Sequence, residues 1–470
     1  MGNLAVAPLA RALPAKGGIA RIVTAAAIGS GFEIYDFTLF AFFTVSIAPA
    51  FFPAADKNTS VLMTIATFGI GAIMRPIGAL LLGMYGDRVG RKAVLSATIV
   101  MMAAGSVAIG LIPRYQTIGI WAPILVVLAR MTQGLSAGGE MGTSLTFVAE
   151  QVPHHRRGFY MGMVSAASLL GTLLSAGLAL SLGHLLGPAA MSEWGWRVPF
   201  LIGGLLAPVG FYIRARLPES EEFLESRAAA KSRTAAIAAS AASAASAAST
   251  PSTPSAPSIV SAASPPSAPS TAAPRLNLRI LLCIMAGIVP SSVINYLTLI
   301  YMPTFLHQRF GVMLDVSFTA VLLGSVAVSV LSPLGGALSD RIGRRGLVLG
   351  GNLALLACSY PLYRALQASP TFATILTVIL AFALLLTLVT SPMVPLAAEM
   401  LPTLGRSTGM SLGLALPIAL LGASSPLLVT LLISLTGNSL APAFYLMAAA
   451  SAGLVGVACL PRRDADHPVA

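Results

Sequence analysis

Four charged residues lie in stretches that are otherwise apolar, and their types indicate a shared chemistry. Glu33 and Asp36 stand three residues apart in GFEIYDFTLFAFF, so a helix places both on one face. Arg75 and Arg130 lie within two later apolar segments. A guanidinium holds a carboxylate through two parallel hydrogen bonds and stays charged at every working pH, whereas a carboxyl group in an apolar cavity can take up a proton. The set predicts a site for an organic anion and for protons.

The roles of these residues follow from their charge. We expect Arg75, Arg130 and Asp36 to bind substrate, and Glu33, Asp36 and Glu140 to couple protons. In an alternative arrangement each arginine is permanently paired with an acid, which satisfies the charges without a ligand. The pairs would then be Arg75 with Asp36, or Arg130 with Glu140. A mixed arrangement, in which such pairs exchange for substrate, is a third hypothesis.

The elements that must carry these charges are membrane helices. Of the 470 residues, 56% are hydrophobic and only 9% are charged, unlike the mixture found in a soluble domain. A helix needs about 20 apolar residues to cross a bilayer. The apolar segments are residues 18–52, 59–85, 93–112, 120–148, 159–187, 196–214, 278–306, 316–338, 346–366, 371–398, 407–436 and 440–460. We therefore predict an all-α membrane protein with twelve transmembrane helices surrounded by lipid. The aromatic Phe37, Phe40 and Phe43 are expected to face lipid or neighbouring helices.

The net charge of +12 follows the predicted topology. With the N-terminus inside, only Lys57, Arg114, Arg197, Arg309 and Arg364 fall outside, and 21 of the 28 Lys and Arg residues fall on the cytoplasmic side. Membrane proteins retain basic loops in the cytoplasm. Both termini are therefore expected to be cytoplasmic, and the basic excess does not require a nucleic-acid partner.

The remaining functional classes lack support in the sequence. Cys283, Cys358 and Cys459 have no paired or ligand-like spacing, so neither a disulfide framework nor a metal site is expected. No hydrolytic or redox constellation is present, which argues against an enzyme. We expect no cofactor and a monomeric protein.

A segment rich in Ala, Ser and Pro divides the chain. It contains AASAASAASTPSTPSAPS and few large apolar residues. Such a composition cannot bury a core, so residues 226–274 are predicted to be a disordered cytoplasmic linker with a transiently helical first half. Residues 1–225 and 275–470 then each form a six-helix bundle.

The two halves share motifs at equivalent places. GMYGDRVGRK follows the second apolar segment and GALSDRIGRR follows the eighth, while Glu150, Pro153 and Arg157 recur with the same spacing as Glu399, Pro402 and Arg406. Aspartate can cap a following helix, and the arginines can pair with Glu150 or Glu399. We predict a cytoplasmic latch, with ordinary basic anchoring as the alternative. Its residues are Gly83, Asp87, Arg88, Arg91, Glu150, Arg157, Asp340, Arg341, Arg344, Glu399 and Arg406.

The doubled Gly-x-x-x-Asp-Arg-x-Gly-Arg-Arg/Lys loop resembles the signature of the major facilitator superfamily. GFEIYDF, MRPIGALLLG, ARMTQGLSAGGE, EWGWRVPFLIG and YMPTFL resemble the metabolite:proton symporter family, and within it bacterial citrate–proton symporters and tricarballylate carriers. The resemblance implies a multi-pass protein of the bacterial inner membrane whose first, fourth and seventh helices line a central cavity. It adds Tyr35, Asn295 and Tyr301 as substrate-binding candidates.

These inferences lead to one expected function and several alternatives. We expect a secondary transporter that imports a di- or tricarboxylate such as citrate with protons, by alternating access. Other family substrates are α-ketoglutarate, shikimate, and a zwitterion such as betaine or proline. A transporter-like sensor that signals without flux is the alternative from another class.

Overall fold

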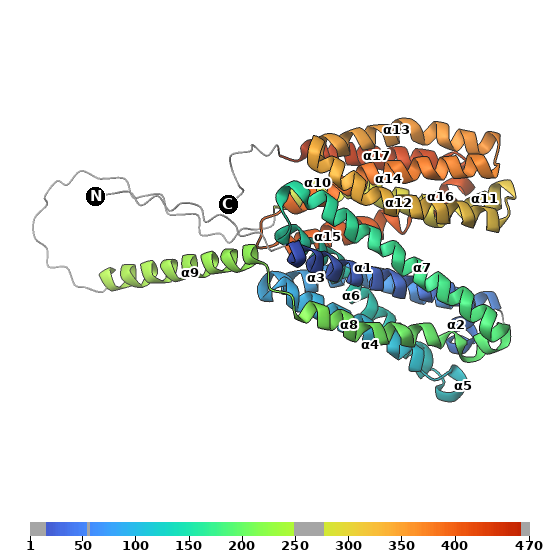
Figure 1. Ribbon diagram of the computed structural model, residues 1–470, viewed down its shortest axis with the longest axis horizontal. Coiled ribbons are helices and arrows are strands. Elements are labelled where there is room, and N and C mark those ends of the chain that lie inside the picture. Colours follow the sequence, from blue (N-terminus) through green and yellow to red (C-terminus); the bar gives the residue numbers. More distant parts are fainter. Residues whose placement is uncertain (1–15, 54–56, 249–276, 462–470) are drawn as a thin grey trace, which may run out of the picture.

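The computed structural model describes residues 16–53, 57–248 and 277–461. Every regular element in these ranges is helical, and Figure 1 shows the helices gathered in two bundles. The first bundle contains α1 (Lys16–Phe42), α2 (Thr44–Phe51), α3 (Lys57–Val89), α4 (Arg91–Leu111), α5 (Tyr115–Ile118), α6 (Trp121–Gln151), η1 (His154–Arg156), α7 (Arg157–Ala190), η2 (Met191–Gly195) and α8 (Arg197–Ala215). The second contains α10 (Leu278–Asn295), η3 (Tyr296–Tyr301), α11 (Met302–Phe310), α12 (Leu314–Ile342), α13 (Arg344–Ala368), α14 (Phe372–Met400), α15 (Arg406–Pro417), η4 (Ile418–Gly422), α16 (Ser425–Thr436) and α17 (Ala441–Cys459).

Twelve of these helical segments can cross a membrane. Ten are long and apolar enough by composition alone, with α10 to α11 and α15 to α16 each forming one span. The other two are α1 and α6, of 27 and 31 residues, which carry all the charged residues of the predicted site except Arg75. These charges lower the hydropathy of both helices, but the side chains are buried inside the protein. The predicted twelve-helix fold is confirmed.

Glycines bring α3 and α6 into backbone contact. A Cβ atom at Gly134 would overlap the carbonyl of Gly71, and one at Gly138 would overlap the carbonyl of Arg75. Two small residues spaced four apart let membrane helices approach closely. The helices that carry Arg75 and Arg130 are therefore held together along their main chains.

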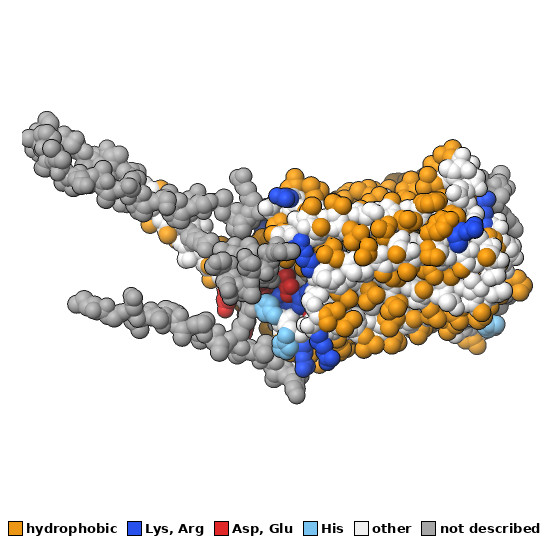
Figure 2. Space-filling model, turned by 90° about the horizontal axis from the view of Figure 1, so that it is seen from above, with side chains coloured by type: hydrophobic (Ala, Val, Ile, Leu, Met, Phe, Trp, Pro, Cys, Tyr) orange, Lys and Arg blue, Asp and Glu red, His pale blue; other side chains and the backbone are white. Residues whose placement is uncertain are grey.

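The two bundles touch at the end that carries residues 87–92 and 340–345, which we call the basic end. Lys and Arg side chains gather there in Figure 2, beyond the hydrophobic flank. Gly158 of α7 packs on Gly336 of α12, and Gly83 of α3 packs on the main chain of Thr408 in α15. Each of these contacts joins one bundle to the other, so the basic end is closed.

The segment between the bundles begins with a helix. α9 (Glu221–Ala248) extends away from the basic end in Figure 1. The linker was predicted to begin at residue 226 with a transiently helical first half, and in the structure α9 covers residues 226–248. Alanine has the highest helix propensity, and the first proline that would interrupt the helix is Pro251. Residues 249–276 lie outside the described ranges.

Candidate functional site

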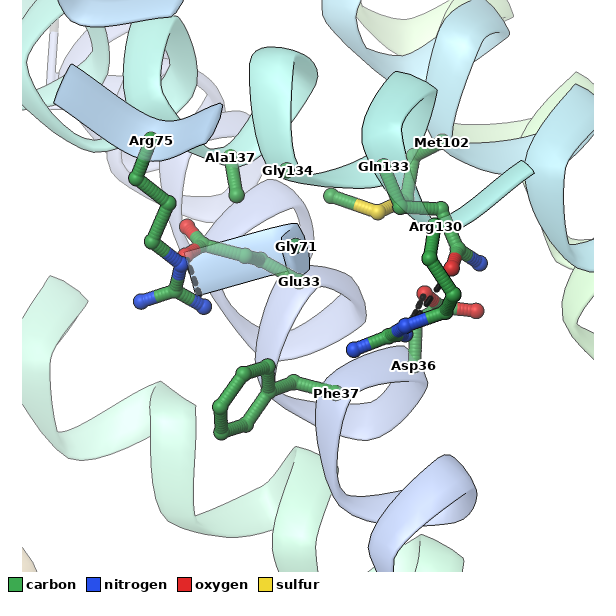
Figure 3. A pocket seen from close by; sticks show the side chains of 10 residues that line it. All are labelled: Glu33, Asp36, Phe37, Gly71, Arg75, Met102, Arg130, Gln133, Gly134 and Ala137. Atoms are coloured by element: carbon green, nitrogen blue, oxygen red, sulfur yellow. Dashed lines mark hydrogen bonds and ion pairs between the residues drawn. The ribbon is translucent and has the colours of Figure 1, made fainter. Parts of the chain in front are cut away.

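A small cavity lies inside the first bundle where α1, α3, α4 and α6 meet (Figure 3). Its volume is about 10 Å³, which is room for about one water molecule. The lining residues are Glu33, Asp36, Phe37, Gly71, Arg75, Met102, Arg130, Gln133, Gly134 and Ala137. The structure thus brings together four of the charged residues that the sequence selects.

Arg75 pairs with Glu33 on one side of the cavity. Their charged atoms lie 3.4 Å apart, and the two side chains are 15% and 6% exposed, respectively. The Arg75 guanidinium also lies 4.6 Å from the ring centre of Phe37. Of the two cavity arginines, Arg75 is therefore the more exposed. Each has an aromatic partner besides its acid, because the Arg130 guanidinium lies 4.5 Å from the ring centre of Phe40.

Arg130 pairs with Asp36 on the other side. Arg130 Nη1 lies 3.9 Å from Asp36 Oδ2, and both side chains are 2% exposed. The same Nη1 donates to Gln133 Oε1 at 2.9 Å. Gln133 Nε2 donates to Ser106 Oγ at 3.2 Å, and Ser106 donates to Asp36. Four side chains from α1, α4 and α6 therefore form a closed polar ring.

This pairing corrects the alternative drawn from the sequence. Arg75 pairs with Glu33 instead of Asp36, and Arg130 pairs with Asp36 instead of Glu140. One helical turn separates the two acids by about 4.5 Å along α1, so each acid reaches a different arginine. Phe37, expected to face lipid or a neighbouring helix, has its ring between the two guanidiniums in Figure 3, 4.6 Å from Arg75 and 6.0 Å from Arg130.

Glu140 lies outside the cavity lining and forms a separate ion pair with Arg214. Both side chains are almost fully buried. Thr98 donates to Glu140, and Arg214 donates to the carbonyl of Leu95 at 2.6 Å. A Cβ atom at Gly29 would overlap the Arg214 guanidinium, so this glycine makes room for the pair. Sequence reasoning missed Arg214 because an arginine in the last turn of a membrane helix usually reaches out to the headgroups.

The three uncharged candidates are not brought to the cavity. The Tyr35 hydroxyl donates to the carbonyl of Pro199 at 2.7 Å, and the Tyr301 hydroxyl lies 2.8 Å from Thr430 Oγ1. Both tyrosines thus join helices within their own bundle. Asn295 is partly buried and does not line the cavity. Polar side chains of a membrane helix often form hydrogen bonds with neighbouring helices, and the two tyrosines do so instead of facing the cavity.

The second bundle approaches the charged site through Tyr296, the first residue of η3. Tyr296 is partly buried and lies within electrostatic range of Arg75 and Glu33. The π-helical turn shifts the register of side chains relative to a regular helix, and such turns are frequent at functional sites. Sequence reasoning selected its neighbour Asn295, because a π-helical turn has no simple signature.

At the basic end, two aspartates cap helices of opposite bundles. Asp87 accepts hydrogen bonds from the main-chain nitrogens of Ser407 and Thr408 at 3.2 and 2.9 Å, at the start of α15. Asp340 accepts bonds from the main-chain nitrogens of Gly158 and Phe159, each at 3.0 Å, at the start of α7. A carboxylate at a helix N-terminus satisfies free donors and the helix dipole. The sequence predicted that each aspartate caps the following helix, but each one caps a helix of the opposite bundle instead.

Ion pairs accompany the first of these caps. Glu150 is bound by Arg91 of its own bundle and by Arg406 of the other, each at 3.2 Å. Arg406 also lies 2.8 Å from Glu222 in α9, which accepts a bond from Thr403 at 3.0 Å. Burial would raise the pKa of Glu222, but the Arg406 charge and these hydrogen bonds outweigh burial and lower it. Glu222 is thus an anionic member of the latch that the motif comparison missed.

The second cap has matching ion pairs. Glu399 is bound by Arg344 of its own bundle and by Arg157 of the other, the latter at 3.4 Å. The predicted pairing of arginines with both glutamates is therefore confirmed. Arg88 and Arg341 are exposed instead. Each follows its capping aspartate directly, and one residue turns a helix by about 100°, so these two side chains point away from the interface.

Comparisons with known proteins identify relatives that match almost the whole chain. A family model described as sugar (and other) transporter matches residues 22–462. A citrate-proton symporter from Klebsiella pneumoniae is 34% identical over 453 residues, which cover 96% of this chain and 94% of that relative. A proline/betaine transporter from Escherichia coli (strain K12) is 30% identical over 439 residues, covering 93% of this chain and 83% of that one.

Among solved structures, the proton:xylose symporter XylE bound to 6-bromo-6-deoxy-D-glucose superposes with a TM-score of 0.71 at 17% identity. The superposition covers 94% of this chain and 95% of the other. At this identity the likeness concerns the fold. Fold, family model and full-length relatives agree that the chain is a transporter and not an enzyme. The chain belongs to the sugar (and other) transporter family of the major facilitator superfamily, as a multi-pass protein of the bacterial inner membrane.

Proposed function

We propose that the protein imports a small organic anion, a di- or tricarboxylate with citrate as the first candidate, together with protons. The observation that carries the proposal is the pairing of two arginines, Arg130 buried and Arg75 partly buried, with two acids around one cavity. Guanidinium groups bind carboxylates bidentately, so two of them suit a substrate with two or more carboxylates. The full-length likeness to citrate-proton symporters supports this substrate class.

The pairs provide a physical reason for coupling. In the structure the Arg75–Glu33 and Arg130–Asp36 pairs balance two positive and two negative charges. A substrate carboxylate can bind an arginine only if the acid that is paired with this arginine releases it. A proton on that acid removes both the competition for the guanidinium and the repulsion of the anion. Binding of the proton therefore increases the affinity for the anion, and binding of the anion increases the affinity for the proton.

Passage to the other side requires the latch to open. The capped helices and backbone contacts at the basic end hold the two bundles together there. In the orientation predicted from the basic loops this end faces the cytoplasm. Release of substrate into the cytoplasm thus requires α15 to leave Asp87 and α7 to leave Asp340. Rocking of two bundles about a central site is the expected movement.

A zwitterion such as betaine or proline is the second candidate. The ring of Phe37 lies beside both arginines, and Glu33 and Asp36 are adjacent to it along α1. An aromatic face with a nearby carboxylate suits a quaternary ammonium group, while an arginine takes the ligand carboxylate. The likeness to proline/betaine transporters supports this candidate.

Uptake into proteoliposomes tests both candidates. Purified protein receives labelled citrate, α-ketoglutarate, shikimate, betaine or proline under an inward proton gradient, with and without a protonophore, and with a sodium gradient as the control. We expect citrate to accumulate and the protonophore to abolish accumulation. Accumulation of betaine or proline alone would support the zwitterion, whereas no accumulation of any organic anion contradicts the main proposal.

A further inference from the structure

The two acids of the cavity are held in different ways. Asp36 accepts a hydrogen bond from Ser106 and faces Arg130 within the polar ring. Among the described residues, Glu33 has one recorded polar contact, the ion pair with Arg75 at 3.4 Å. A hydrogen bond donated to a carboxylate favours its charged form, so the Ser106 hydroxyl gives ionised Asp36 a stabilising contact that Glu33 does not have among the described residues.

Three members of the ring, Asp36, Arg130 and Gln133, line the cavity, and the fourth, Ser106, lies behind them. Ser106 does not line the cavity, and its hydroxyl connects Gln133 to Asp36. Gly105 provides the space, because a Cβ atom there would meet Gln133 Cγ at 2.5 Å. The Gln133 carbonyl oxygen in turn accepts from Arg130. Each hydrogen bond of the ring thus joins one member to the next, and Asp36 is the acid that both Ser106 and Arg130 face.

We infer that Ser106 and Gln133 are positioning residues that keep Asp36 ionised beside Arg130, so that the proton taken up with the substrate binds to Glu33 and releases Arg75. The inference rests on the proposed coupling of an anion to protons. In the step, a proton from the outside converts the Glu33 carboxylate into a neutral carboxylic acid. Arg75 keeps its own proton and its charge, and it exchanges Glu33 for a substrate carboxylate. When the substrate leaves, the proton leaves Glu33 and the pair forms again.

The surroundings of Glu33 permit this exchange. The charged and titratable groups that face it are Arg75 of α3, Glu140 of α6 and Tyr296 of η3. Glu140 is bound to Arg214, so it does not compete for Arg75. After protonation of Glu33, Arg75 still has the ring of Phe37 and is 15% exposed. Arg130 is only 2% exposed, so loss of the Asp36 charge would leave a buried cation without its acid.

Infrared difference spectroscopy of the purified protein tests the assignment without any substrate. A titration across neutral pH is expected to show the carbonyl band of one protonated carboxyl group. The band should be lost in Glu33→Gln and kept in Asp36→Asn. Ser106→Ala should add a second titrating band, because Asp36 loses its donor. The matched control is Ser136→Ala, which removes a buried hydroxyl that bonds the carbonyl of Thr98 and should leave one band.

Each alternative result overturns the inference. Loss of the band in Asp36→Asn with retention in Glu33→Gln places the proton on the other acid. A wild-type protein without a titrating band has no such carboxyl group. If Ser106→Ala and Ser136→Ala give the same spectrum, Ser106 has no positioning role. Unfolded variants are recognised by their thermal melting, and Gln133→Leu replaces Ser106→Ala if the latter does not fold.

Transport measurements supply the second readout. In Glu33→Gln, proton-driven accumulation of citrate should be lost and the remaining exchange of citrate should no longer depend on pH. In Ser106→Ala, the pH profile of citrate uptake should move to higher pH than in Ser136→Ala. If the wild-type protein transports no citrate, the proposed substrate is wrong while the infrared assignment stands. The two failures are therefore distinguishable.

Discussion

Asp87 and Asp340 occupy equivalent positions in the two halves, and each caps a helix that belongs to the opposite half. The relationship is reciprocal: Asp87 binds the start of α15, and Asp340 binds the start of α7. Each cap is accompanied by a glutamate that two arginines hold, one from either bundle. Closure of the basic end thus depends on two matching sets of interactions.

Replacement of a capping aspartate should loosen this closure. We expect Asp87→Ala to destabilise the first turn of α15 by about 0.5 to 2 kcal/mol, because two main-chain donors lose their acceptor. A loss of about 1 to 2 kcal/mol, the upper part of that range, should accelerate hydrogen exchange of residues 406–410 by about 5- to 30-fold. Glu193→Ala, at an exposed position in η2, is the control and should leave this exchange unchanged. Equal protection in both variants would contradict the capping role.

The two arginines should respond differently to truncation. We expect Arg75→Ala to fold and to raise the KM for citrate about tenfold to a hundredfold, since a charge-assisted hydrogen bond contributes about 1.5 to 3 kcal/mol. The measurement is initial uptake in proteoliposomes against substrate concentration. Normal uptake by this variant would reassign Arg75 to a structural role.

Truncation of Arg130 should act on stability first. Arg130→Ala leaves Asp36 buried without its cation, and breaking such a pair costs about 3 to 5 kcal/mol. The thermal unfolding midpoint in detergent should fall markedly, and adding Asp36→Asn should restore much of the loss. A variant with an unchanged midpoint would show that the pair contributes little to the fold.

The Arg214–Glu140 pair should have a structural role. Glu140→Gln is expected to lower the unfolding midpoint, because Arg214 keeps its charge in a buried site. The proton dependence of citrate uptake should be unaffected in the protein that folds. The double variant Glu140→Leu with Arg214→Met should recover stability, since an apolar pair of similar volume needs no charge balance. Loss of proton coupling in Glu140→Gln would contradict the structural role and show that Glu140 takes part in proton-coupled transport.

Acidification should weaken the latch at Glu222. The lowered pKa of Glu222 means that its ionised form is stabilised in the folded protein. This contribution is present at neutral pH and is lost as the pH falls below about 4 and passes through the lowered pKa. The protection factor for hydrogen exchange at the start of α15, which corrects for the slower intrinsic exchange in acid, should then fall. Glu222→Gln should show the faster exchange already at pH 7, whereas Glu221→Gln, at the exposed neighbouring position, should match the wild type.

Local patterns in the sequence were sufficient for much of this description. A charge in an apolar run is visible without a structure, so Glu33, Asp36, Arg75 and Arg130 could be selected as one site. The repeated loops likewise predicted a latch that includes Asp87. In both cases the signal lies in residue type and spacing along one segment, and the energetic penalty for a lipid-facing charge supplies the reason.

These patterns could not predict which residues of two different helices pair with each other. Whether Arg75 meets Glu33 or Asp36 depends on the relative rotation and depth of α1 and α3, which residue spacing within one helix does not define. The same holds for Arg214, whose burial depends on the space left by Gly29. Tyr35 was expected at the cavity, but its hydroxyl bonds the carbonyl of Pro199 in a neighbouring helix. A tyrosine in a membrane helix can bond either a ligand or another helix, so its residue type does not decide between them.

The backbone contact between α3 and α6 has a consequence for selectivity. At Gly134 and Gly138 the backbones of these helices are in contact, so the helices have no room to approach further and the origins of the Arg75 and Arg130 side chains belong to one tightly packed helix pair. The part of the cavity next to Arg130 and Asp36 therefore lies at a nearly constant distance from the backbone that carries Arg75. A ligand bound to Arg75 extends toward this part, so ligands whose carbon chains differ in length are distinguished by how well they fit that distance.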